Sequence, residues 1–371
     1  MAKPFEFHIS GKKLVMALLV TVVPISMAAL YASTEAGKAS GRAAGRHLET
    51  VAKSVAVQVS HRIHEKVVEA ALIASDAAIH ELVRASNLQY QRVPDDVILE
   101  RLMAKEKIWN TPQGRDLVEQ TMSNPASEAL RRKMTVDPSF LRITVTDWKG
   151  ATVAASHKTL DYYQADEEYW QDIYFYGRGV VSITDVLYDD ATQHNYIGVG
   201  VPVVDENNTI IGTLDALVDI SALSSLANRS DLGAGGVVAL AKGDGRLIAS
   251  SETLSVANQT RSVEVDAFLD ARDSFQGRAS GYFKASFPNG RQAYVAFART
   301  GLQEQYKRLD WLVVASEDTS ETAVSGVQIL IMGIALLSLA SVVFLIVYLA
   351  LHRQSEIEEV EERMGESLKQ S

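Results

Sequence analysis

The sequence predicts an α+β protein in which a long N-terminal helix precedes two tandem modules with antiparallel sheets, flanked by two transmembrane helices. Three observations support this fold class: two long uncharged runs, an apolar stripe with helical spacing, and a strand–turn–strand pattern that occurs twice. A chain of 371 residues has room for two or three domains. The net charge of −10 and the lack of a basic stripe argue against a nucleic-acid partner.

Two uncharged runs, residues 14–33 and 324–351, are each long enough to cross a membrane. A membrane-spanning helix needs roughly 20 apolar residues. A cleaved signal peptide is the alternative for the first run, because Lys12 and Lys13 precede it. The apolar part is, however, longer than is usual in signal peptides. We therefore expect residues 14–33 to form an uncleaved anchor.

The charges around the second run indicate the orientation. Acidic residues precede it, and Arg353 follows it. Because basic residues favour the cytoplasmic side, we expect the tails 1–13 and 352–371 to be cytoplasmic. Residues 34–322 would then lie outside. The chain has no cysteine, so this region contains no disulfide.

The outer region begins with a long predicted helix, within residues 34–92. No proline occurs from residue 34 to residue 88, and glycine stops after Gly45. Apolar residues recur at steps of three or four, which draws one stripe along a helix. These residues are Leu48, Val51, Val55, Val59, Ile63 and Val67.

An internal repeat follows the helix. Residues 143–156 and 238–251 both read as a strand, a glycine turn and a second strand, with Gly150 aligned to Gly245. Two weaker matches follow in the same order, between residues 196–200 and 294–298 and between residues 212–218 and 309–315. The repeat predicts two similar modules, at residues 93–231 and 232–322.

This layout resembles the double Cache sensory region of bacterial transmembrane receptors. The resemblance is carried by the long helix, the Asp147–Ser156 segment, the 201–212 hairpin, and the segments that begin at Gly245 and Trp311. It implies a sensor of the bacterial inner membrane that crosses the membrane twice and forms a homodimer. Ligands of that family usually bind in the membrane-distal module, here residues 93–231, inside a PAS-like antiparallel sheet. Residues 232–322 would be the membrane-proximal module, which passes the signal to the second transmembrane helix.

The resemblance also implies a ligand-binding motif. Members that bind amino acids carry tyrosine, four residues, arginine, one residue, tryptophan and tyrosine, then tyrosine-x-aspartate and a later aspartate. This chain departs from the motif in two places, where Glu168 replaces the arginine and Gln171 replaces the second tyrosine. The candidate ligand-binding residues are Tyr163, Glu168, Trp170, Tyr188, Asp190 and Asp219.

The departures bear on the class of ligand. A glutamate would repel a ligand carboxylate that an arginine would bind, whereas carboxylates and aromatic rings suit an ammonium group. We therefore expect a small-molecule ligand, an amine or amino-acid-like compound, and favour a cationic amine without an α-carboxylate. For each of these residues, packing in a half-buried sheet or capping of a turn is an equal interpretation.

No enzyme motif stands out, and we expect no catalysis, no cofactor and no metal. The chain lacks a GxSxG elbow, a phosphate loop and an HExxH pair. His61 and His64 share a helix face, which is better explained as a solvated face. The alternative function is an interaction protein whose outer region docks another extracytoplasmic protein.

The segment after Leu351 predicts one short amphipathic helix, with apolar residues at 357, 360, 364 and 368. Such a helix could pair with itself or with a partner. It is too short to be a signalling domain. The output would therefore come from a separate cytoplasmic signalling protein, or from a domain removed by truncation.

Overall fold

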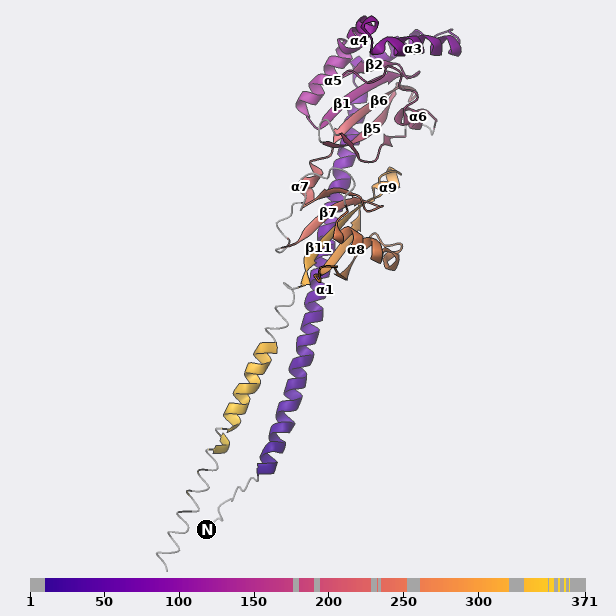
Figure 1. Cartoon of the computed structure of the whole chain (residues 1–371). Helices are drawn as coiled ribbons and strands as arrows, with labels where there is room; N and C mark the ends of the chain where they lie inside the picture. Colours follow the sequence, from indigo (N-terminus) through magenta and orange to yellow (C-terminus); the bar gives the residue numbers. More distant parts are fainter. Residues whose placement is uncertain are drawn as a thin grey trace, which may run out of the picture. The chain divides into compact units, whose positions relative to one another are not determined.

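The computed structural model describes residues 11–175, 180–189, 194–227, 232, 235–251, 261–319, 330–345 and 347–349, with residues 353, 357 and 360 (Figure 1). The chain forms two compact units. One is Gly45–Glu317, and the other combines Met1–Ala44 with Asp318–Ser371. The amphipathic helix predicted for residues 352–371 lies outside the described residues, apart from the three single positions.

The first helix, α1 (Gly11–Ala74), has 64 residues. All six residues of the predicted apolar stripe are buried, so this prediction is confirmed. The expected single helix is broken, however, before α2 (Ala77–Leu88). Asp76 lies in an extended conformation there, and its side chain accepts a 2.8 Å hydrogen bond from the backbone N–H of Ala78. This N-cap satisfies a donor that the start of a new helix would leave unpaired.

Three further helices precede the first sheet. They are α3 (Asp95–Trp109), α4 (Arg115–Met122) and α5 (Pro125–Val136), and a 3₁₀ turn, η1 (Pro112–Gly114), separates the first two. Proline is the first residue of η1 and of α5, where its fixed φ suits the first turn and its missing N–H costs nothing.

The first sheet contains β1 (Phe140–Asp147), β2 (Thr152–Ala155), β3 (Ser182–Ile183), β4 (Leu187–Asp189), β5 (His194–Val204) and β6 (Ile210–Asp219). Its antiparallel order is β2-β1-β6-β5-β3, with β4 also paired to β5. A short helix, α6 (Glu168–Phe175), lies between β2 and β3 in the chain.

The second sheet contains β7 (Val237–Lys242), β8 (Leu247–Ser250), β9 (Ser280–Ser286), β10 (Gln292–Arg299) and β11 (Trp311–Asp318). Its order, β8-β7-β11-β10-β9, repeats that of the first sheet, which confirms the internal repeat. Gly150 and Gly245 occupy equivalent turns with φ of 84° and 90°, a backbone region that favours glycine. The described residues between Asp219 and Trp311 also form α7 (Leu223–Ala227), α8 (Val263–Ala271), η2 (Arg272–Phe275) and α9 (Leu302–Gln305).

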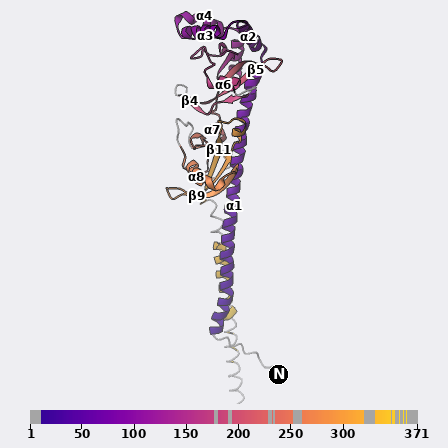
Figure 2. The ribbon, with the colours of Figure 1, turned by 90° about the vertical axis from the view of Figure 1, so that its right-hand side faces the viewer.

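One face of each sheet packs on α1, which runs beside both sheets in Figures 1 and 2. A single apolar cluster joins the stripe of α1 to alternate residues of the central strands. From the first sheet it takes Ile143, Val145, Leu214 and Ala216, and from the second Val238, Leu240, Val313 and Ala315. The opposite face of the second sheet has its own core with α8, built around Phe268 and Phe297.

Among the described residues, one helix is long and apolar enough to cross a membrane, Leu330–Leu349, with a mean hydropathy of 2.9. The assignment as a membrane-spanning helix rests on length and composition alone. The helix lies within the predicted run 324–351. Residues 14–33 are helical as part of α1. A second membrane-spanning helix there stays a prediction.

Candidate functional site

The candidate site lies on the face of the first sheet that points away from α1. Because successive residues of a strand alternate between faces, Ile143 and Val145 point to α1 while Arg142 and Thr144 point to the other side. The register places Thr144 opposite Asp215 of β6, and Asp215 opposite Gly200 of β5. Two charged side chains, Arg142 from β1 and Asp215 from β6, therefore share this face of the sheet.

Helix α6 covers part of this face because β5 carries glycine there. A methyl group at Gly200 would lie only 3.1 Å from Cβ of Tyr169 and 3.4 Å from Cδ1 of Ile173. Tyr169, Trp170 and Ile173 of α6 are all buried and form a cluster of their own. The ring of Trp170 stacks on that of Tyr174, with centroids 4.4 Å apart. The sequence of β5 thus lets the helix approach the backbone of the sheet.

We define the inner-face cluster as Arg142, Thr144 and Asp215 on this face, Tyr169 of α6, and the exposed Glu167 just before α6, whose charge acts on both Asp215 and Tyr169. Burial raises the pKa of Asp215 to about 6; the charge of Arg142 opposes this shift, and that of Glu167 adds to it. Burial also raises the pKa of Tyr169, whose hydroxyl donates a 3.1 Å hydrogen bond to Gln164 Oε1.

Several polar atoms of this cluster lack partners within the described part of the chain. The Nε of Arg142 and the Oγ1 of Thr144 are buried without a hydrogen bond. The hydroxyl of Tyr174, farther along α6, is also buried without one. No hydrogen bond contributes to the pKa of Asp215. Leaving a buried polar group unpaired costs about 1–3 kcal/mol, so such groups in native proteins call for an explanation. A bound polar molecule is one.

The structure distributes the five sequence-predicted residues that it describes over several places. Trp170 lies in the α6 cluster, whereas Glu168 is exposed at the start of α6 and forms an ion pair with Arg308, 2.7 Å away. Tyr163 packs beside α3, and its backbone N–H donates to Glu106.

Two other predicted residues lie next to the start of β5. Tyr188 of β4 pairs with Asn195, and Asp219 at the end of β6 pairs with Tyr196. The carboxylate of Asp219 accepts a 2.7 Å hydrogen bond from the N–H of Ser221, as a turn cap does. Asp190 lies outside the described residues.

The sequence reasoning missed Arg142, Thr144 and Asp215. A signal was present, because Arg142 and Asp215 interrupt the apolar alternation of strands whose other residues are mostly hydrophobic. That signal becomes a site only once the strand register shows that the two positions share a face.

Metal binding finds no support in the part of the chain that the structure describes, which contains no group of three or more potential ligands. His64, one of the two histidines noted in the sequence, lies with its Nδ1 3.3 Å from the hydroxyl of Tyr306. It therefore serves a contact between α1 and the segment before β11.

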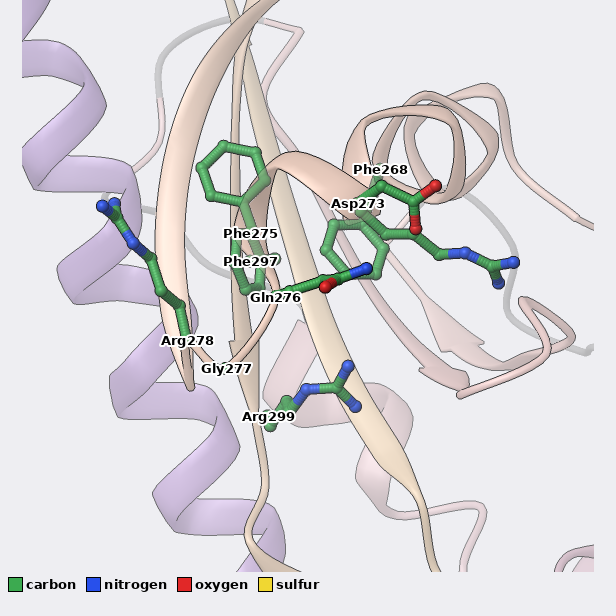
Figure 3. Close-up of a pocket in the computed structure, with 9 residues that line it drawn as sticks. Phe268, Asp273, Phe275, Gln276, Gly277, Arg278, Phe297 and Arg299 are labelled. Atoms are coloured by element: carbon green, nitrogen blue, oxygen red, sulfur yellow. The ribbon is translucent and has the colours of Figure 1, made fainter.

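A hollow lies at the other sheet, between η2, β9 and β10, with a volume of about 230 Å³ (Figure 3). The rings of Phe268 and Phe275 both pack on that of Phe297 there, with centroids 4.7 and 5.1 Å from it. Arg299 at its rim forms an ion pair with Asp310. This hollow is the open edge of the core around α8, and the inner-face cluster is the stronger candidate site.

Comparison with known proteins identifies the family. The chain matches the Cache domain family over residues 36–326, and it belongs to that family. No curated protein matched the chain. Among solved structures, it is similar to the extracellular domain of rpHK1S-Z16, described as a histidine kinase. That domain is 17% identical over 74% of this chain and 93% of its own, with a TM-score of 0.45.

Two chemoreceptor domains are similar to the same degree. The ligand-binding domain of the Pseudomonas aeruginosa PAO1 amino acid chemoreceptor PctC, in complex with GABA, is 12% identical over 74% of this chain and 99% of its own, with a TM-score of 0.44. The periplasmic sensory domain of the Campylobacter jejuni chemoreceptor Tlp1 is 13% identical over 76% and 98%, with a TM-score of 0.43.

Proposed function

We propose that this protein is a sensor of the bacterial inner membrane that binds a small ligand in its first Cache module, residues 93–231. The signal would pass through the second module and the helix within residues 324–351 to a cytoplasmic partner or output domain. Membership of the Cache family supports a sensory role. The observation that carries the ligand site is Asp215, a buried carboxyl group for which the described residues provide no hydrogen bond, on the sheet face that α6 covers at Gly200.

For the ligand we propose a cationic amine. An ammonium group would donate hydrogen bonds to Asp215 and, together with the charge of Arg142, would stabilise its ionised form. Glu167 and the ring of Tyr169 add a second carboxylate and an aromatic surface, both of which suit a cation. Glu168, the residue that first suggested an amine, would act indirectly through its ion pair with Arg308.

A second candidate is an amino-acid-like ligand, and Arg142 is the observation that favours it. Its buried Nε has no partner in the described part of the chain, and a ligand carboxylate would satisfy it. The two candidates differ in one chemical group, so amines and amino acids with the same carbon skeleton separate them.

A thermal-shift screen of the full-length chain in detergent tests this function. The panel contains amines, amino acids and simple carboxylates. A ligand at a hundred times its dissociation constant stabilises by about 2.7 kcal/mol, which is easily measured as a rise in melting temperature. We expect amines to give this rise, Asp215→Asn to abolish it, and the control Asp273→Asn, an exposed aspartate of the second module, to retain it.

If no class of compound raises the melting temperature, the sensor function is wrong and the alternative of an interaction protein is favoured. If amino acids but not the matching amines stabilise the chain, the amine is replaced by the second candidate. We also propose that the protein is a homodimer held together by α1 and the membrane helices, which sedimentation in detergent would test.

A further inference from the structure

We propose that Arg308 couples the position of α6 to the second sheet, so that a change at the inner-face cluster reaches β11. This inference rests on the proposed function, because α6 covers the candidate ligand site. It concerns how that site communicates and does not depend on which ligand occupies it.

The first step of the coupling is a set of ion pairs between Arg308 and α6. Its Nη1 lies 2.5 Å from Oδ2 of Asp172, and its Nη2 lies 3.3 Å from the other oxygen of the same carboxylate. Nη2 also lies 2.7 Å from Oε1 of Glu168, one helical turn earlier. A bidentate guanidinium–carboxylate pair fixes direction as well as distance. One side chain therefore holds two successive turns of the helix.

The carboxylate of Asp172 also ties Arg308 to the first sheet. It accepts a 2.6 Å hydrogen bond from the hydroxyl of Ser182 in β3, which pairs with Gly200 of β5. Burial works against its charge, but the hydrogen bonds from Arg308 and Ser182 prevail and lower the pKa of Asp172. The pair is therefore ionised at neutral pH.

The outer and inner sides of α6 move together because the helix has only eight residues. Glu168 and Asp172 hold Arg308, while Tyr169 and Ile173, each the next residue along, pack at Gly200. A molecule that displaced Tyr169 from the sheet would displace the two carboxylates by a similar amount.

The second step is the anchoring of Arg308 to the second sheet. On one side, the hydroxyl of Tyr306 contacts His64 of α1. On the other, Leu309 and Trp311 are buried, and Trp311 begins β11. Strand β11 is central in its sheet, between β7 and β10. The segment around Arg308 is thus too well anchored to absorb a movement of α6 without passing it on.

A neighbouring contact provides a built-in comparison. Asp185, between β3 and β4, accepts a 3.0 Å hydrogen bond from Nε1 of Trp311 and pairs with Lys242 of β7 at 2.9 Å. This contact also joins the two sheets, but it does not involve α6. If Arg308 is the coupling residue, its removal should disconnect α6 from β11 while the Asp185 contact persists.

Hydrogen–deuterium exchange of the full-length chain in detergent tests the proposal without any ligand. Arg308→Gln removes the charge and is expected to raise the exchange rates of α6 amides about threefold, because local opening becomes easier. Lys307→Gln, the exposed neighbour, is the matched control and should leave α6 unchanged. Circular dichroism and the melting temperature verify that each variant is folded. Unchanged exchange in α6 of Arg308→Gln would overturn the proposal.

The coupling itself is measured with Gly200→Ala, whose added methyl group presses on Tyr169 and Ile173. This variant should raise exchange in α6 and in β11. In the double variant Gly200→Ala/Arg308→Gln, α6 should still respond, whereas β11 should exchange as in Arg308→Gln alone. A response of β11 that survives the loss of Arg308 would assign the coupling to another contact and refute the proposal. Because no ligand is added, failure here is distinct from failure of the ligand screen.

Discussion

The hydroxyl of Tyr90 donates a 2.7 Å hydrogen bond to the carboxylate of Asp147, a fully buried residue at the end of β1. The same carboxylate accepts hydrogen bonds from the hydroxyl of Ser86 at 2.7 Å and from the N–H groups of Lys149 and Ala151 at 2.9 and 3.0 Å. One side chain thus fixes the β1–β2 turn and joins it to α2.

We expect Asp147→Ala to destabilise the protein strongly, by about 3 kcal/mol or more, since it leaves several buried donors without an acceptor. Tyr90→Phe removes one of the four hydrogen bonds and should cost only about 1 kcal/mol. Unfolding in urea, followed by circular dichroism, measures both. A loss below that of Tyr90→Phe would show that Asp147 does not organise this turn.

Asp215 should make stability depend on pH near 6. Its pKa is about 6 in the folded chain, above the value of about 3.9 expected when unfolded, so the folded state binds more protons between these values. The resulting stabilisation is complete below pH 4 and is lost as the pH rises through 6. The free energy of unfolding of Asp215→Asn, taken relative to that of the wild type, should therefore rise by about 2 kcal/mol from pH 4 to pH 8. Urea unfolding at both pH values decides this, and an unchanged difference would contradict it.

The ion pair between Lys66 and Asp137 should make the stability of the protein depend on pH in the acid range. Lys66 Nζ lies 2.5 Å from Asp137 and 2.9 Å from Glu69. Burial alone would raise the pKa of Asp137, but the hydrogen bonds from Lys66 and Ser139 lower it below the ordinary range. This stabilisation is present above the unfolded pKa of about 3.9 and is lost as the pH falls. Lys66→Met should cost about 1 kcal/mol at pH 7 and progressively less as the pH is lowered from 4 to 2. An equal loss at pH 7 and pH 2 would rule out the ion pair as its cause.

Two glycines of α1 should respond in opposite ways to alanine. Alanine normally stabilises a helix by about 1 kcal/mol relative to glycine. Gly37 has open space around it, so Gly37→Ala should show this gain. Gly45 lies under the ring of Tyr282 in β9, and a methyl group there would overlap the ring atoms. Gly45→Ala should therefore destabilise, and Gly45→Ala/Tyr282→Ala should recover most of the loss. Thermal unfolding of the three variants compares them.

Sequence periodicity predicted the parts of this fold that depend on nearby residues. The stripe of α1 from Leu48 to Val67 follows from a repeat of three and four, and the paired hairpins follow from alternation around Gly150 and Gly245. The break at Asp76 was missed although an aspartate before a helical run is a capping signal, because the apolar pattern continues beyond it.

The site was harder to predict because its residues meet through strand register and long-range pairing. Arg142 and Asp215 share a face only because β6 lies beside β1, although five other elements separate these strands in the chain. Glu168 occupies a motif position, but its partner Arg308 is 140 residues away, and no local pattern connects them. The motif therefore gave no indication that the side chain of Glu168 pairs with Arg308, and its role in ligand binding stays a prediction.

The apolar cluster along α1 has a consequence for how this chain loses its structure. Each sheet buries one face against the same helix, so neither has a complete core without it. Detaching α1 from one sheet would expose part of the stripe that also supports the other. The repeat in the sequence suggests two independent folding units, whereas the shared helix makes Gly45–Glu317 one cooperative unit that should melt in a single transition.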